Sequence, residues 1–65
     1  MNLKAARVNQ NLTQKQAAEK LGITVDMLSN YERGLSYPKA PVIQKMLEVY
    51  KVSFDQLVFL PKSTV

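Results

Sequence analysis

Apolar residues recur along this chain at intervals of three and four, which is the spacing of one buried face of a helix. The clearest such stripe is formed by Ile43, Met46, Leu47 and Tyr50. Similar faces recur before and after it, and no segment shows the strict alternation of a strand. The pattern predicts helices over about residues 2–10, 14–21, 25–33, 41–50 and 54–60. The predicted fold class is all-α, with five helices in a single domain of residues 1–65.

Residues that begin and end helices stand at the predicted boundaries. Thr13 and Ser53 are each followed three residues later by Gln, which is the pattern of a capping box. Thr24 also stands where an N-cap is needed, and Gly22 stands where the preceding helix must stop. Asn11 fits the left-handed position that closes the first helix.

The middle of the chain carries the most specific pattern. Residues 13–34 predict two short helices joined by a turn at Gly22, with the small side chain of Ala18 at their closest approach. A helix pair arranged in this way can place its second helix in the major groove of DNA. We therefore interpret this stretch as a helix-turn-helix.

Composition excludes several classes of function. The 65 residues include no Cys and no His, so the sequence predicts neither a disulfide nor an ordinary zinc site. A catalytic base or nucleophile would have to come from five scattered acidic residues or an activated Ser, and two glycines cannot form a phosphate-binding loop. We expect no enzyme activity, no metal, no cofactor and no small-molecule ligand.

Charge narrows the choice of partner. Nine Lys and Arg against five Asp and Glu give a net charge of +4, which in so small a domain favours a polyanion such as nucleic acid. Charge alone does not separate such a protein from a merely basic domain. The chain has no apolar run of the length of a signal peptide or a membrane span, so we expect a cytoplasmic protein with no membrane partner.

With these features the chain resembles the lambda-repressor-like, Cro/C1-type (XRE family) helix-turn-helix domains. The resemblance covers about residues 3–60, and its landmarks keep the family's spacing: Gln14, Ala18, Gly22, Thr24, Glu-Arg-Gly at 32–34, Pro38 and Val52-Ser53. It implies a five-helix DNA-binding domain whose helix-turn-helix is formed by the second and third helices. Ala6 is smaller than the family's usual aliphatic residue, and Lys51 replaces a Gly or Asn that adopts positive φ.

The resemblance assigns the helix from Thr24 to Arg33 as the recognition helix. On a helical wheel one arc of about 140°, opposite Leu28 and Tyr31, is covered by Val25, Asp26, Ser29, Asn30 and Arg33. The residues implied to read bases are Val25, Asp26, Ser29 and Asn30. Asn30 would pair with adenine and Asp26 would accept from cytosine N4. The alternative is an ordinary solvated face, on which Asp26 only stabilises the helix dipole.

The resemblance also implies phosphate contacts and one ion pair. Gln14 matches a residue that anchors a phosphate at the start of the second helix, where free N–H groups attract anions. The full set of implied phosphate contacts is Gln14, Lys15, Thr24, Arg33, Tyr37 and Lys39. Arg7 and Glu32 match a family ion pair that ties the first helix to the recognition helix, so we interpret Glu32 as structural.

These expectations together predict a sequence-specific transcriptional regulator of double-stranded DNA. Because no ligand or protease domain follows the bundle, we expect a small repressor of phage, prophage or mobile-element type that acts by occupying an operator. One recognition helix reads only about four or five base pairs, which favours a homodimer on a pseudo-palindromic operator. The possible dimer surface is Phe54, Val58, Phe59 and Leu60, unless these residues complete the monomer core. The alternative function is a protein-interaction module, such as an antitoxin or adaptor with the same fold.

Overall fold

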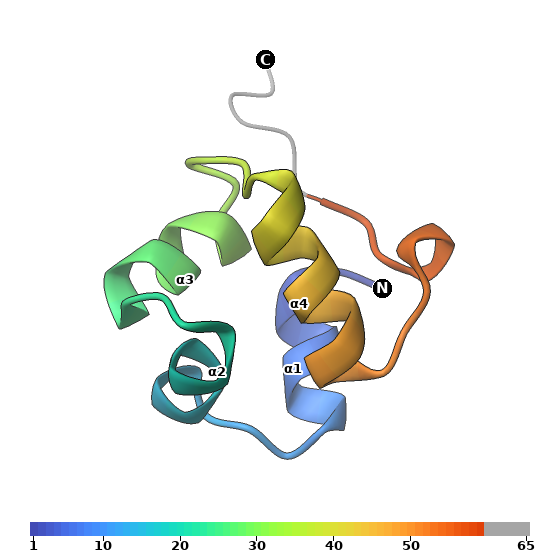
Figure 1. Cartoon of the computed structure of the whole chain (residues 1–65), viewed down its shortest axis with the longest axis horizontal. Coiled ribbons are helices and arrows are strands. Elements are labelled where there is room, and N and C mark those ends of the chain that lie inside the picture. Colours follow the sequence, from blue (N-terminus) through green and yellow to red (C-terminus); the bar gives the residue numbers. More distant parts are fainter. Residues whose placement is uncertain (60–65) are drawn as a thin grey trace.

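The computed structural model describes residues 1–59, in which four α-helices are followed by a single turn of 3-10 helix (Figure 1). The elements are α1 Leu3–Asn9, α2 Gln14–Leu21, α3 Val25–Glu32, α4 Ala40–Tyr50 and η1 Phe54–Gln56. The first four predicted helices agree with the observed bounds to within one residue at each end. None of the helices in the described part of the chain is long and apolar enough to cross a membrane.

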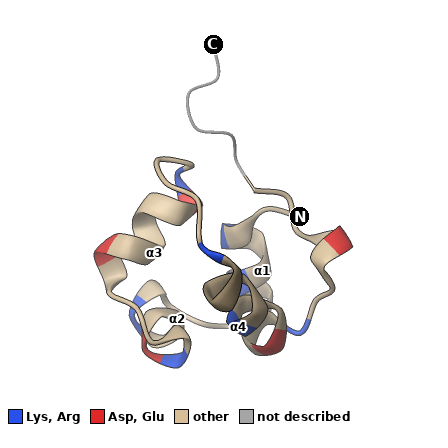
Figure 2. Ribbon diagram, turned by 45° about the horizontal axis from the view of Figure 1, so that its top comes forward, with Lys and Arg blue, Asp and Glu red and all other residues tan. Residues whose placement is uncertain are grey.

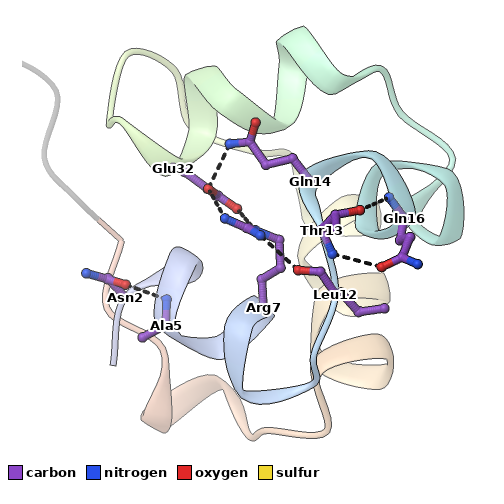
Figure 3. Close-up of polar contacts among 8 residues, drawn as sticks. All are labelled: Asn2, Ala5, Arg7, Leu12, Thr13, Gln14, Gln16 and Glu32. Atoms are coloured by element: carbon purple, nitrogen blue, oxygen red, sulfur yellow. Dashed lines mark hydrogen bonds and ion pairs between the residues drawn. The ribbon is translucent and has the colours of Figure 1, made fainter.

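The first two helices begin at side-chain caps, and the cap of α2 is the capping box that the sequence predicts. The Oδ1 of Asn2 accepts a hydrogen bond from the Ala5 N–H at 2.7 Å (Figure 3). In α2 the Oγ1 of Thr13 accepts from the Gln16 N–H at 3.1 Å, and the Gln16 Oε1 accepts from the Thr13 N–H at 2.9 Å. These bonds satisfy backbone donors that a helix start otherwise leaves without partners.

The turn between α2 and α3 forms where the sequence predicts it. Gly22 adopts the left-handed conformation with φ 73° and ψ 29°, which residues with a Cβ rarely adopt. Two residues later the Oγ1 of Thr24 accepts from the Met27 N–H at 3.0 Å and caps α3. The chain therefore changes direction within three residues, and α2 and α3 pack against each other as a helix-turn-helix (Figure 1).

One core lies between the four helices. Its largest fully buried side chains are those of Leu28, Met46 and Tyr50, which come from α3 and α4. The whole buried apolar set is Leu3, Ala6, Ala17, Ala18, Leu21, Leu28, Met46, Tyr50 and Leu57. Because Ala6 has no exposed surface, its small side chain belongs to this core rather than to a loose end of α1.

The prediction of a fifth α-helix over residues 54–60 is wrong. The predicted capping contact forms, since Gln56 Oε1 accepts from the Ser53 N–H at 2.9 Å, but η1 is only one turn long. Leu57 is already extended, and the Val58 N–H donates to the Met1 carbonyl at 2.8 Å. This pairing, a parallel bridge between residues 2 and 58, satisfies the backbone without a helix. Residues 60–65 lie outside the described part of the chain.

The C-terminal end of α4 holds a lysine in a conformation that favours glycine. Lys51 has φ 57° and ψ 47°, which agrees with the expectation that this position needs positive φ. The next residue closes the helix, since the Val52 N–H donates to the Leu47 carbonyl at 3.2 Å. For a side chain with a Cβ, the left-handed region costs about 1–2 kcal/mol.

We expect Lys51→Gly to raise the free energy of unfolding by about 0.5–1 kcal/mol, because relief of this strain outweighs the greater freedom of glycine in the unfolded chain. Urea denaturation followed by circular dichroism measures the change. Lys51→Ala is the matched control, since it removes the same charge and keeps the Cβ. An equal gain from the alanine variant would show that charge, rather than backbone conformation, is responsible.

Candidate nucleic-acid interface

The side of α3 that faces away from the core carries the predicted base-reading residues. Leu28 on the inner side has no exposed surface, whereas Val25 on the outer side is 40% exposed. Asp26 is also exposed, and Ser29 and Asn30 are half-buried. The structure therefore brings all four residues to one outer face, and their contacts with bases remain a prediction.

Met27 is an apolar side chain at the edge of this face that was not among the residues predicted to read bases. It is 39% exposed and lies next to the predicted arc. The sequence does contain a signal for Met27, because it is an apolar residue of the recognition helix that lies outside the buried stripe of Leu28 and Tyr31. Such a side chain can contact a thymine methyl group.

A polar contact joins two side chains at the C-terminal end of the α3 face. The Nη2 of Arg33 donates to the Oδ1 of Asn30 at 3.1 Å. The two residues are three apart, which places them on neighbouring positions of the helix surface. Arg33 is exposed and forms the C-cap of α3. The contact places the guanidinium of Arg33 against the amide oxygen of Asn30.

A buried ion pair joins α1 to the last residue of α3 (Figure 3). The Nε of Arg7 donates to the Glu32 Oε2 at 2.7 Å and the Nη2 donates to the Oε1 at 3.2 Å. The Nη1 of Arg7 also donates to the Leu12 carbonyl at 2.8 Å. Arg7 and Glu32 are only 7% and 8% exposed, so water hydrates neither charge well. Each charge is instead stabilised by its partner in the ion pair. The pair ties α1 to the end of α3.

Gln14, the first residue of α2, joins the same group of side chains. Its Nε2 donates to the Glu32 Oε1 at 3.0 Å (Figure 3). An amide has two N–H donors and a carbonyl acceptor, so this contact still leaves a donor for an anion. Nothing in the spacing of the residues predicts that Gln14 contacts Glu32. The contact fixes the position of Gln14, and its role toward phosphate remains a prediction.

The remaining predicted phosphate contacts lie at the ends of helices and in the loop after α3. Lys15 is exposed in the first turn of α2, and Lys39 is the exposed N-cap of α4. Tyr37 is 60% exposed in the loop between α3 and α4. Figure 2 shows basic segments at the start of α2, at the end of α3 and just before α4. The Thr24 Oγ1 accepts from Met27, so its hydroxyl proton is still available to an anion.

The possible dimer surface forms part of an aromatic cluster. The Phe59 ring lies 5.0 Å from the ring of Tyr37 and 6.0 Å from the ring of Phe54, measured between centroids. Phe54 and Val58 are 53% and 57% exposed, so these two residues do not complete the monomer core. Phe59 is partly buried against the core. Leu60, the fourth residue of the predicted surface, lies outside the described residues.

A helix-turn-helix family model matches residues 3–57 of this chain. The chain belongs to the Cro/C1-type helix-turn-helix family. Its relatives include the HTH-type transcriptional regulator ImmR of Bacillus subtilis, with 47% identity over 55 residues, or 85% of this chain and 43% of ImmR. The uncharacterized HTH-type transcriptional regulator YazB of the same organism is 38% identical over 55 residues, which are 85% of this chain and 80% of YazB. No solved structure matches the chain significantly.

The match to the family model and to these two relatives confirms the family resemblance that the sequence analysis identified. The family consists of DNA-binding transcriptional regulators rather than enzymes, in agreement with the expectation drawn from composition. This chain spans less than half the length of ImmR, so the match concerns the domain rather than the whole of that relative.

Proposed function

We propose that this protein is a sequence-specific, double-stranded DNA-binding transcriptional regulator that acts in the cytoplasm by occupying an operator. The observation that carries the proposal is the exposed outer face of α3, where Val25 and Asp26 project away from the core. A face of mixed polar and apolar groups on an α-helix fits the width of the major groove. The resemblance to regulators such as ImmR supports the same function. Its proposed biological setting is that of a small phage, prophage or mobile-element repressor.

The backbone of DNA would be held on both sides of α3. On one side Gln14 and Lys15 stand at the start of α2, where free backbone N–H groups also attract phosphate. On the other side the loop of residues 34–39 carries Tyr37 and ends at the positively charged Lys39. Contacts of this kind set the register of a protein on the duplex, and the bases are then read by α3.

We further propose a homodimer that binds a pseudo-palindromic operator. One α3 spans too few base pairs to select a site in a genome, and a twofold pair of recognition helices doubles the sequence that is read. The exposed aromatic and apolar side chains of Phe54 and Val58 support a contact between subunits at the C-terminal segment. A dimer of this kind places its half-sites about one helical turn apart.

Selection of bound duplexes from a random pool, with the full chain as bait, tests the proposed function. We expect an enriched motif made of two inverted half-sites about ten base pairs apart, centre to centre. The selection should be run at two salt concentrations, because weak phosphate contacts dominate at low salt. Failure to enrich any sequence at either concentration would overturn sequence-specific binding and favour a protein-interaction module.

Lys39→Ala is expected to weaken binding to every duplex and to flatten the slope of log K against log salt by about 0.9, the value for one lost phosphate contact. Fluorescence anisotropy with a labelled duplex at several salt concentrations measures this slope. Lys45→Ala is the matched control, since it removes the same charge from an exposed position on α4. If both variants leave the slope unchanged, Lys39 does not contact the backbone.

A further inference from the structure

We propose that Asn30 and Arg33 act as one reading unit that selects guanine in the major groove. The inference rests on the proposed DNA-binding function and assigns a base to one end of α3. It replaces two expectations from the sequence, namely that Asn30 pairs with adenine and that Arg33 contacts a phosphate.

The two side chains lie side by side at the end of α3. They are three residues apart, and Arg33 Nη2 donates to Asn30 Oδ1 at 3.1 Å. Both belong to the outer face that also carries Ser29, on the side opposite the buried Leu28. The guanidinium therefore lies beside the amide of the residue predicted to reach the bases, rather than extended away from it.

The contact between them determines which hydrogen-bonding groups remain free. The amide oxygen of Asn30 is the only acceptor in the pair, and one of its two lone pairs already receives the Arg33 proton. Beside the second lone pair of that oxygen, the pair presents the amide NH₂ of Asn30 and the other N–H groups of the guanidinium, all of which donate. The pair therefore presents several donors and little acceptor capacity.

These donors match the edge of one base better than the others. In the major groove guanine offers two adjacent acceptors, N7 and O6, whereas adenine offers the N7 acceptor beside the N6 amino donor. To bind adenine in a two-pronged manner, Asn30 needs its oxygen as an acceptor for N6. With the guanidinium of Arg33 held at that oxygen, the adenine amino group would have to share the acceptor with a cationic donor, which disfavours adenine. Guanine is the base that accepts from both members of the pair.

Binding-site selection with variants tests the proposal, and it does not require the operator sequence. Asn30→Ala and Arg33→Ala are compared with the unchanged chain, and Lys45→Ala serves as a control that removes a charge from an exposed position on α4. We expect the unchanged chain to select guanine at one position of each half-site. Both α3 variants should lose the preference at that same position, and Lys45→Ala should retain the complete motif. A thermal melt of each variant checks that it is folded.

A modified base then tests the chemistry at the identified position. Replacing that guanine with 7-deazaguanine removes the N7 acceptor and should weaken binding of the unchanged chain about tenfold, the effect of one charge-assisted hydrogen bond. The same replacement should have no effect on Arg33→Ala if that side chain is the donor to N7. In the Asn30→Ala, Arg33→Ala double variant, the loss should be smaller than the sum of the single losses.

Three results would overturn the inference and leave the proposed function intact. These are an adenine at the shared position, loss of preference at two separate positions, and an equal loss with Arg33→Ala on all duplexes together with a salt slope flattened by about 0.9. The last result would return Arg33 to the phosphate contacts. Absence of any motif with the unchanged chain would instead reject sequence-specific binding, and the guanine assignment with it.

Discussion

Glu32→Ala is expected to lower the free energy of unfolding by about 3–5 kcal/mol, the effect of removing one partner of a buried ion pair. The variant leaves the guanidinium of Arg7 buried and without the carboxylate that now accepts from two of its nitrogens. Gln14 loses its acceptor as well. A domain of this size has a total stability of about 3–10 kcal/mol, so the expected loss is a large fraction of the total and unfolds the variant if its stability lies at the lower end of this range.

Urea denaturation followed by circular dichroism measures this loss, and two variants show its origin. Gln14→Ala removes one partly buried hydrogen bond to the same carboxylate and should lower stability by only about 0.5–1.5 kcal/mol. Arg7→Met combined with Glu32→Leu removes both charges and should recover most of the lost stability. A loss below about 1 kcal/mol for Glu32→Ala would mean that the pair is well solvated and does not hold α3 in place.

The ion pair matters for the proposed function because of where its members lie. Arg7 belongs to α1, Gln14 begins α2 and Glu32 ends α3, so one carboxylate joins the three helices (Figure 3). The same Gln14 that is predicted to anchor a phosphate is thereby fixed relative to the recognition helix. A fixed distance between a phosphate contact and the reading face sets the register in which α3 meets the bases.

The elements that could be predicted from the sequence are those set by near neighbours. The start of α2 depends on Thr13 and Gln16, which are three residues apart and form both bonds of the predicted capping box. The turn depends on one glycine with φ 73°. The outer face of α3 follows from the helical period alone, because the position of each side chain around a helix is fixed by its number.

The C-terminal segment could not be predicted in the same way. Its capping box is present, but the Val58 N–H finds its acceptor in Met1 at the other end of the chain. A local pattern contains no information about such a partner, and a single turn of helix has little stability of its own. Val58 and Phe59 also belong to residue types that favour extended backbone. Tertiary pairing therefore replaced the predicted helix.

The side-chain contacts within the candidate site could not be predicted from the sequence either. Arg33 can reach solvent, a phosphate or Asn30, and Gln14 can reach solvent or Glu32. The choice depends on side-chain rotamers and on the helix that packs opposite, neither of which the spacing of residues specifies. In the proposed DNA interface these two contacts would change the chemistry offered to DNA, since one places a guanidinium at an amide oxygen and the other holds an amide nitrogen.

Tyr50 is a buried group whose ionisation should make stability depend on pH. Its side chain has no exposed surface, and among the described residues its hydroxyl has no hydrogen-bond partner. Burial raises the pKa of Tyr50 to about 12, with a further upward contribution from the nearby Glu32 carboxylate and an opposing one from Arg7. In the unfolded chain the same phenol has a pKa of about 10. The folded state therefore holds the proton more tightly than the unfolded state does.

We expect the free energy of unfolding to fall by about 2 kcal/mol between pH 10 and pH 12 through Tyr50 alone. In that interval the unfolded chain has released the phenol proton and the folded chain retains it, so each unit of rising pH favours unfolding. Tyr50→Phe removes this contribution. Because it also removes a buried hydroxyl that lacks a partner, it should leave stability at pH 7 unchanged or slightly raised. Urea denaturation of both proteins at pH 7, 10, 11 and 12 isolates the effect as the difference between them. Parallel curves for the two proteins would show that the phenol is as easily ionised in the folded state as in the unfolded one.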